Sequence, residues 1–163
     1  MKALKLFIWL LPVCFLMTAC PVGIDYPADE EGKNAIDKKL IGTWKCSKPD
    51  HEIVKMKIEA KDKNTYTINI LEKGGMYSVA SDKWTAWITT IDKYRIIYAK
   101  PEGENQYYHY CYEVEKSTLR TWDISLLAGG VDAVTSTQSL REEIKASSEK
   151  EEFLSSETVY EKE

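Results

Sequence analysis

The chain has 163 residues, of which 44% are hydrophobic, 29% charged and 11% aromatic, and it contains only 8 glycines and 5 prolines. This composition excludes an intrinsically disordered segment, a multi-pass membrane protein and a repeat protein, and the length fits one domain. The net charge of −4 at pH 7 provides no basic surface for a phosphate backbone, so we expect no nucleic-acid partner.

Residues 1–19 have the organisation of an export signal. Lys2 and Lys5 precede an apolar run from Leu6 to Met17, and small residues follow this run. An apolar run of this length is too short to span a bilayer, which needs about 20 residues. We therefore predict a signal peptide that is removed after export, rather than a retained membrane helix.

The end of this signal resembles the lipobox of bacterial lipoproteins. Met17-Thr18-Ala19-Cys20 departs from it only in having Met17 where leucine is commonest, and Cys14, which follows the bulky Val13, is the poorer acceptor. The resemblance implies a lipid on Cys20, with acyl chains such as palmitate that anchor the mature protein to a membrane. Pro21 differs from the aspartate that retains many lipoproteins in the inner membrane. We therefore expect the outer membrane of a bacterial envelope, on either its periplasmic or its surface face.

Residues 20–39 are polar, contain prolines and glycines, and show no sustained hydrophobic period. We predict that they form a lipidated flexible tether with a reach of about 25 Å. The globular domain is then expected to begin at Leu40 and to cover residues 40–163.

From Leu40 onward the hydrophobic period is two. In residues 52–60, for example, Val54, Met56 and Ile58 alternate with lysines, a pattern typical of a strand with one buried face. Turn residues separate further runs of this kind. We expect strands over residues 40–46, 52–60, 65–72, 76–80, 84–91, 94–100, 107–115 and 118–127. Their short connections favour a mainly β fold, an eight-stranded antiparallel meander barrel, with a sandwich as the alternative.

The pattern becomes helical after Gly129-Gly130. Ser139 followed by Glu142 predicts a capping box that opens a helix reaching about Ser147, inside a helical segment over residues 136–155. A short final strand is expected over residues 157–162.

The first predicted strand and the order of elements resemble the lipocalins and the lipocalin-like bacterial lipoproteins. Gly42-x-Trp44 matches the Gly-x-Trp signature at the start of the first strand, and residues 90–94 are a loose counterpart of the family's Thr-Asp-Tyr signature. The resemblance implies that Gly42 and Trp44 plug the closed end of the barrel. It also implies an arginine from the last barrel strand packed against the tryptophan, for which Arg120 is the nearest candidate.

Two cysteines remain once Cys14 has left with the signal and Cys20 is lipidated. Exported proteins meet oxidising conditions, so this even remainder predicts a disulfide between Cys46 and Cys111. The alternative is two separately buried thiols that behave as small hydrophobic side chains.

The sequence offers little for catalysis. His51 lies in a predicted turn, and His109 shares a strand face with Cys111 at a side-chain separation of roughly 6–7 Å, which is too far for a dyad. The sequence contains no nucleophile elbow, phosphate loop or metal-ligand cluster. We expect no enzyme activity, no cofactor and no metal.

Aromatic side chains are the stronger lead. An eight-stranded barrel is either filled by side chains or holds one small ligand. The first hypothesis is a membrane-anchored lipoprotein that binds a small hydrophobic or aromatic ligand in a pocket lined by Tyr66, Tyr98, Tyr108, Tyr110 and Tyr112. The alternative is a non-catalytic interaction protein, an inhibitor or envelope assembly subunit, whose barrel is filled. An interior cavity of about 300 Å³ or more would favour the first hypothesis.

Overall fold

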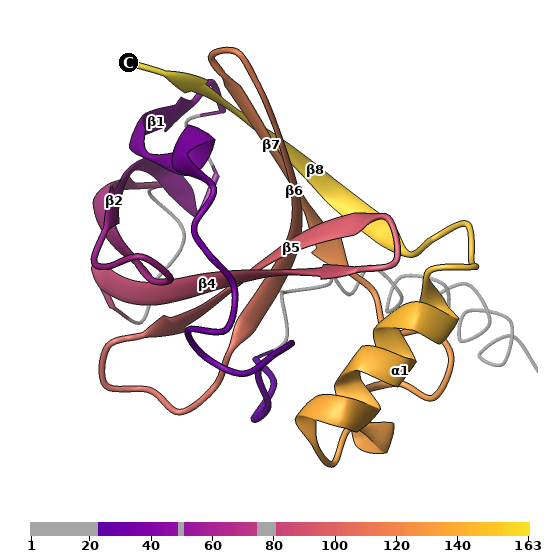
Figure 1. Cartoon of the computed structure of the whole chain (residues 1–163). Helices are drawn as coiled ribbons and strands as arrows, with labels where there is room; N and C mark the ends of the chain where they lie inside the picture. Colours follow the sequence, from indigo (N-terminus) through magenta and orange to yellow (C-terminus); the bar gives the residue numbers. More distant parts are fainter. Residues whose placement is uncertain (1–22, 49–50, 75–80) are drawn as a thin grey trace, which may run out of the picture.

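A computed structural model describes residues 23–48, 51–74 and 81–163. These residues form a closed antiparallel barrel in which the strands follow one another in chain order (Figure 1). The predicted fold class is therefore confirmed. The strands are β1 (Gly42–Cys46), β2 (Ile53–Ala60), β3 (Tyr66–Lys73), β4 (Lys83–Ile91), β5 (Tyr94–Pro101), β6 (Tyr108–Glu115), β7 (Thr118–Ile124) and β8 (Leu154–Lys162).

The C-terminal strand closes the barrel. β8 pairs with β7 on one side and with β1 on the other. It starts three residues earlier than the predicted final strand, and helix α1 (Thr137–Ser147) separates it from β7. The predicted strand over residues 76–80, the signal peptide and Cys20 lie outside the described residues.

Helix α1 ends at Ser147 as predicted but begins earlier than the predicted capping box. Its N-cap is Ser136, whose side chain accepts a hydrogen bond from the Ser139 backbone N–H at 3.0 Å. The Ser139 hydroxyl in turn accepts from the Ser136 backbone N–H at 2.9 Å. The prediction of a box from Ser139 to Glu142 was wrong because a serine takes the place that glutamate usually fills at the third helical position.

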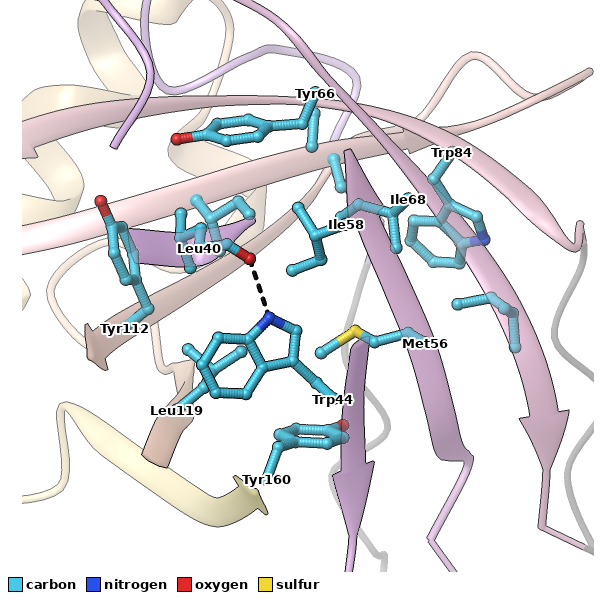
Figure 2. Close-up of a cluster of buried hydrophobic side chains, with 14 of the residues drawn as sticks. Leu40, Trp44, Met56, Ile58, Tyr66, Ile68, Trp84, Tyr112, Leu119 and Tyr160 are labelled. Atoms are coloured by element: carbon cyan, nitrogen blue, oxygen red, sulfur yellow. Dashed lines mark hydrogen bonds between the residues drawn. The ribbon is translucent and has the colours of Figure 1, made fainter. Parts of the chain in front are cut away.

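The inward side chains of the strands form one hydrophobic core. Trp44 is fully buried in it, and its indole Nε1 donates a hydrogen bond of 2.8 Å to the Leu40 carbonyl (Figure 2). Leu40 ends the short 3-10 helix η2 (Lys38–Leu40), which precedes β1. Because the polar atom of the indole is satisfied, the whole ring contributes to the core without an unpaired donor.

A second core lies outside the barrel wall. Strands β4, β5 and β6 also carry apolar side chains on their outer face, including Trp87 and Tyr98, whose rings stack at 5.8 Å. Leu140 and Ile144 of α1 pack against this face, together with Ile24 near the start of the described chain. The wall is therefore buried on both sides over these strands.

Residues 23–39 do not form the predicted flexible tether. Ile24 exchanges two backbone hydrogen bonds with Tyr107, at 2.9 and 2.8 Å, and Ala28 is completely buried. The buried Asp29 accepts a hydrogen bond of 2.8 Å from Thr89 of β4. In Figure 1 this segment, which we call the strap, crosses in front of β4. The prediction failed because the few apolar residues of the strap match an outer sheet face that water would otherwise cover.

His109 lies in the outer core. Its ring stacks on Tyr98 at 6.1 Å, and neither ring nitrogen has a partner of normal hydrogen-bond geometry among the described residues. Burial lowers the pKa of His109 to about 3, opposed by an interaction with the Tyr26 backbone. The folded protein therefore keeps this imidazole neutral over a pH range in which the unfolded chain protonates it.

Truncation of the buried tryptophan tests its contribution to the inner core. We expect Trp44→Ala to lower the free energy of unfolding by about 3–5 kcal/mol, because it removes a large side chain from a closed core. Urea denaturation followed by circular dichroism measures this change. Arg120→Ala is the control, since that side chain is exposed, and its effect is expected to stay below about 1 kcal/mol. Similar losses in the free energy of unfolding for both variants would contradict the placement of Trp44 in the inner core.

The buried histidine predicts a pH dependence of stability. Below a pH of about 6.5 the unfolded chain binds a proton that folded His109 does not accept until about pH 3, so stability falls as the pH decreases. Between pH 7.5 and 5 we expect a loss of about 2 kcal/mol relative to His109→Leu. Urea titrations of both proteins measure it, and the comparison cancels the titration of other groups. If both proteins lost the same stability between pH 7.5 and 5, His109 would take up its proton in the folded protein as readily as in the unfolded chain.

Candidate functional site

Within the part of the barrel that the structure describes, a small apolar cavity of about 70 Å³ lies in the interior. Its walls include Met56, Trp84 and Tyr110 from three different strands. Sites for small ligands usually measure roughly 300–1,000 Å³. The described side chains thus fill most of the space that the first hypothesis assigned to a ligand.

The predicted ligand-lining tyrosines divide between the two faces of the wall. Tyr98 belongs to the outer core, so its assignment to the interior was wrong: residues 97 and 99 of its strand point inward instead. Tyr108 and Tyr110 do contact the inner core, where Tyr108 packs on Trp84 at 5.3 Å. Only Tyr110 and Tyr112 of the predicted set line the cavity.

Tyr66 and Tyr112 are engaged in a polar network at the closed end. The Tyr66 hydroxyl accepts a hydrogen bond of 2.5 Å from the Asp37 backbone N–H and donates to the Asp37 carbonyl at 3.1 Å. Arg95 pairs with the Asp37 carboxylate, and its guanidinium lies 4.6 Å from the Tyr112 ring centre and donates to the Tyr112 hydroxyl at 2.9 Å. This network fixes the strap where it enters η2, so the hydroxyl groups of both tyrosines are engaged in structural hydrogen bonds.

Gly42 and Trp44 lie at this closed end, but Arg120 does not join them. Leu119 points into the core, so Arg120 points outward and pairs with Glu157 at 2.9 Å. The cation that faces the Trp44 ring is instead Lys162 of β8, at 5.2 Å from the ring centre. A Cβ at Gly42, whose φ is +151°, would lie 2.4 Å from the Lys162 Cε atom. The flexible lysine side chain could move aside, so the positive φ, which L side chains rarely adopt, is what favours glycine at position 42.

The predicted disulfide is not formed, and both cysteines are free and buried. Cys46 belongs to the inner core and Cys111 to the outer core. The barrel wall therefore separates their side chains, which cannot meet without breaking the sheet. Burial raises the pKa of Cys111 to about 12, which leaves its thiol protonated and poorly reactive. The alternative of two separately buried thiols is the correct one.

Polar residues gather at the opposite end of the barrel, a feature that the sequence did not reveal. His51 Nε2 lies 2.9 Å from the Thr158 hydroxyl, and its Nδ1 accepts from the Ile53 backbone N–H at 3.2 Å. Burial raises the pKa of Glu52 and of Asp123, although nearby His51 lowers both. No group of three or more His, Cys, Asp or Glu side chains among the described residues is arranged to hold a metal ion.

A groove of about 680 Å³ lies in the wall where β5 and β6 part, and its lining includes residues from both faces of the sheet. Their paired register covers only Ile96–Ala99 and Tyr108–Cys111, whereas β5 begins at Tyr94 and β6 continues to Glu115. Basic side chains outnumber acidic ones in the lining. The charged residues are Lys39, Lys93, Arg95, Lys116, Glu113 and Glu115, and the partly exposed apolar ones are Tyr94, Trp122 and Leu154.

This groove combines features that suit an anionic partner. Three lysines are exposed, and the apolar rings beside them offer surface that a partner would remove from water. Because Arg95 is paired with Asp37, the three lysines exceed Glu113 and Glu115 by one charge. We call the groove that these residues line the wall groove.

Comparison of the chain with protein-family models, with curated proteins and with solved structures gives no match. No helix within the described ranges is long and apolar enough to cross a membrane.

The separation of the cysteines predicts the thiol chemistry of the mature domain. Residues 21–163 contain only Cys46 and Cys111, so the unreduced, denatured domain is expected to bind two maleimides. The native domain is expected to react far more slowly, because both thiols are buried. Intact-mass spectrometry counts the adducts. A denatured domain that binds none before reduction would reveal a bridge.

Proposed function

We propose that this protein is a lipid-anchored, non-catalytic lipoprotein of the bacterial envelope that binds a partner on its outer surface. The observation that carries the proposal is the size of the interior cavity that the described residues line, about 70 Å³, which is well below that of an ordinary ligand site. The wall groove offers a far larger contact region. Of the two hypotheses from the sequence, the filled barrel thus has the better physical support.

The anchor is part of this proposal. It rests on the resemblance of Met17-Thr18-Ala19-Cys20 to a lipobox, and Pro21 favours the outer membrane. A lipid on Cys20 would hold the protein at the bilayer without a spanning helix. The partner is then an envelope protein with an acidic surface, because the wall groove presents Lys39, Lys93 and Lys116.

Native mass spectrometry of residues 21–163 tests the filled barrel. This fragment retains every described strand, the strap and both cores. We expect the mass of the protein alone after purification from bacteria. A retained molecule of lipid size would instead support a ligand inside the barrel.

Photo-crosslinking in the native host tests whether the wall groove contacts a partner. A photoreactive residue at Glu113, inside the wall groove, is expected to yield a defined adduct that weakens several-fold in the charge reversal Lys39→Glu/Lys93→Glu. The matched control is the same residue at Lys57, which is exposed on β2. Equal adducts at both positions, or no effect of the charge reversal, would reject the wall groove as the partner surface.

A further inference from the structure

The strap is attached to the barrel almost from the first described residue. Besides the two backbone bonds between Ile24 and Tyr107, the Tyr107 hydroxyl donates to Glu31 at 2.7 Å and Tyr98 donates to the Glu30 carbonyl at 3.2 Å. Arg141 of α1 donates to the Ala28 carbonyl at 2.9 Å and to the Asp29 carboxylate at 3.3 Å. These contacts join the strap to β4, β5, β6 and α1 together.

Asp29 strengthens this attachment electrostatically. Although burial alone would raise its pKa, hydrogen bonds from Lys33, Thr89 and the Glu30 backbone, together with the Arg141 charge, lower the pKa of Asp29 below its ordinary value. The carboxylate is therefore ionised at neutral pH and holds its donors around it. A strap held in this way does not act as a free linker.

Very little chain separates Ile24 from the proposed lipid. Four peptide links join Cys20 to Ile24, and a fully extended chain spans at most about 3.6 Å per residue. The Ile24 backbone therefore lies within about 14 Å of the lipidated cysteine. Since Ile24 is bonded to Tyr107, the same limit brings the start of β6 and the turn before it close to the membrane.

Strand β6 leads away from this point toward the wall groove. Tyr107 immediately precedes β6, and Glu115 ends the strand beside the wall groove. Eight residues of strand at about 3.3 Å each separate these ends by about 26 Å. The wall groove, whose lining on this strand runs from Cys111 to Glu115, thus occupies the half of β6 that is farther from the lipid.

We propose that the barrel stands on the bilayer surface with its β5–β6 turn, residues 102–106, toward the lipid and the wall groove turned away. This inference rests on the proposed lipidation of Cys20. Asp25 and Glu102 are exposed at the near end, so a zwitterionic surface suits it better than an anionic one. The short link, rather than charge attraction, holds this end at the membrane.

Fluorescence quenching by lipid tests the orientation on the full-length protein after export and maturation. The protein is placed in phosphatidylcholine vesicles that contain a headgroup nitroxide lipid, with a dye on Asn105→Cys or on Lys116→Cys. Both positions are exposed, whereas Cys46 and Cys111 are buried and escape labelling. We expect several-fold stronger quenching at position 105 than at position 116.

A lengthened link is the matched control. A Gly/Ser insert of about 15 residues between Val22 and Gly23 leaves the strap contacts intact and adds a reach of roughly 20 Å. Quenching at position 105 is then expected to fall to the level at position 116. Equal quenching at the two positions without the insert, or quenching unchanged by it, would overturn the inference.

Intact-mass spectrometry of the same samples separates the two proposals. A protein without the added lipid mass on Cys20 would remove the proposed anchoring and the inference with it. A lipidated protein whose two labels are quenched equally would refute the orientation alone. Circular dichroism of each variant establishes that the labelled proteins are folded.

Discussion

Strands β4 to β6 must bury both of their faces, and much of the molecule follows from this constraint. A closed barrel removes its inner face from water by curling, but it does nothing for apolar side chains on the outside. Trp87, Tyr98 and Cys111 lie on that outside and need a cover. Helix α1 and the strap supply this cover. The strap precedes β1, and α1 lies between β7 and β8.

The outer layer also decides how the site is shaped. The hairpin that joins β4 and β5 leans toward this layer, where Tyr94 packs edge-on against Phe153 at 4.9 Å. Tyr94 and Arg95 of β5 are not paired with β6, and the wall groove lies at this gap. The interior cavity that the described side chains line is far smaller, at about 70 Å³, and Trp44, Tyr66 and Tyr112 belong to the inner core beside it.

The barrel was predictable because period-two alternation directly reports one buried face, as in β2. It was harder to predict from the sequence which face of the sheet a single residue occupies. Arg120 and Lys162 lie on neighbouring strands, and only the three-dimensional register shows that Lys162 faces Trp44. The same uncertainty about faces led Cys46 and Cys111 to be paired across a wall. The strap was missed because its apolar residues have no period of their own and become meaningful only against the outer face of the sheet.

The pairing of β8 with β1 has a consequence for how the molecule is made. One seam of β8 joins residues 160–162 to residues 44–46 of β1, so the wall stays open until these distant segments meet. Contacts that connect such distant parts of a sequence form late and slowly. Closure of the wall is therefore expected to be the slowest step in forming the barrel.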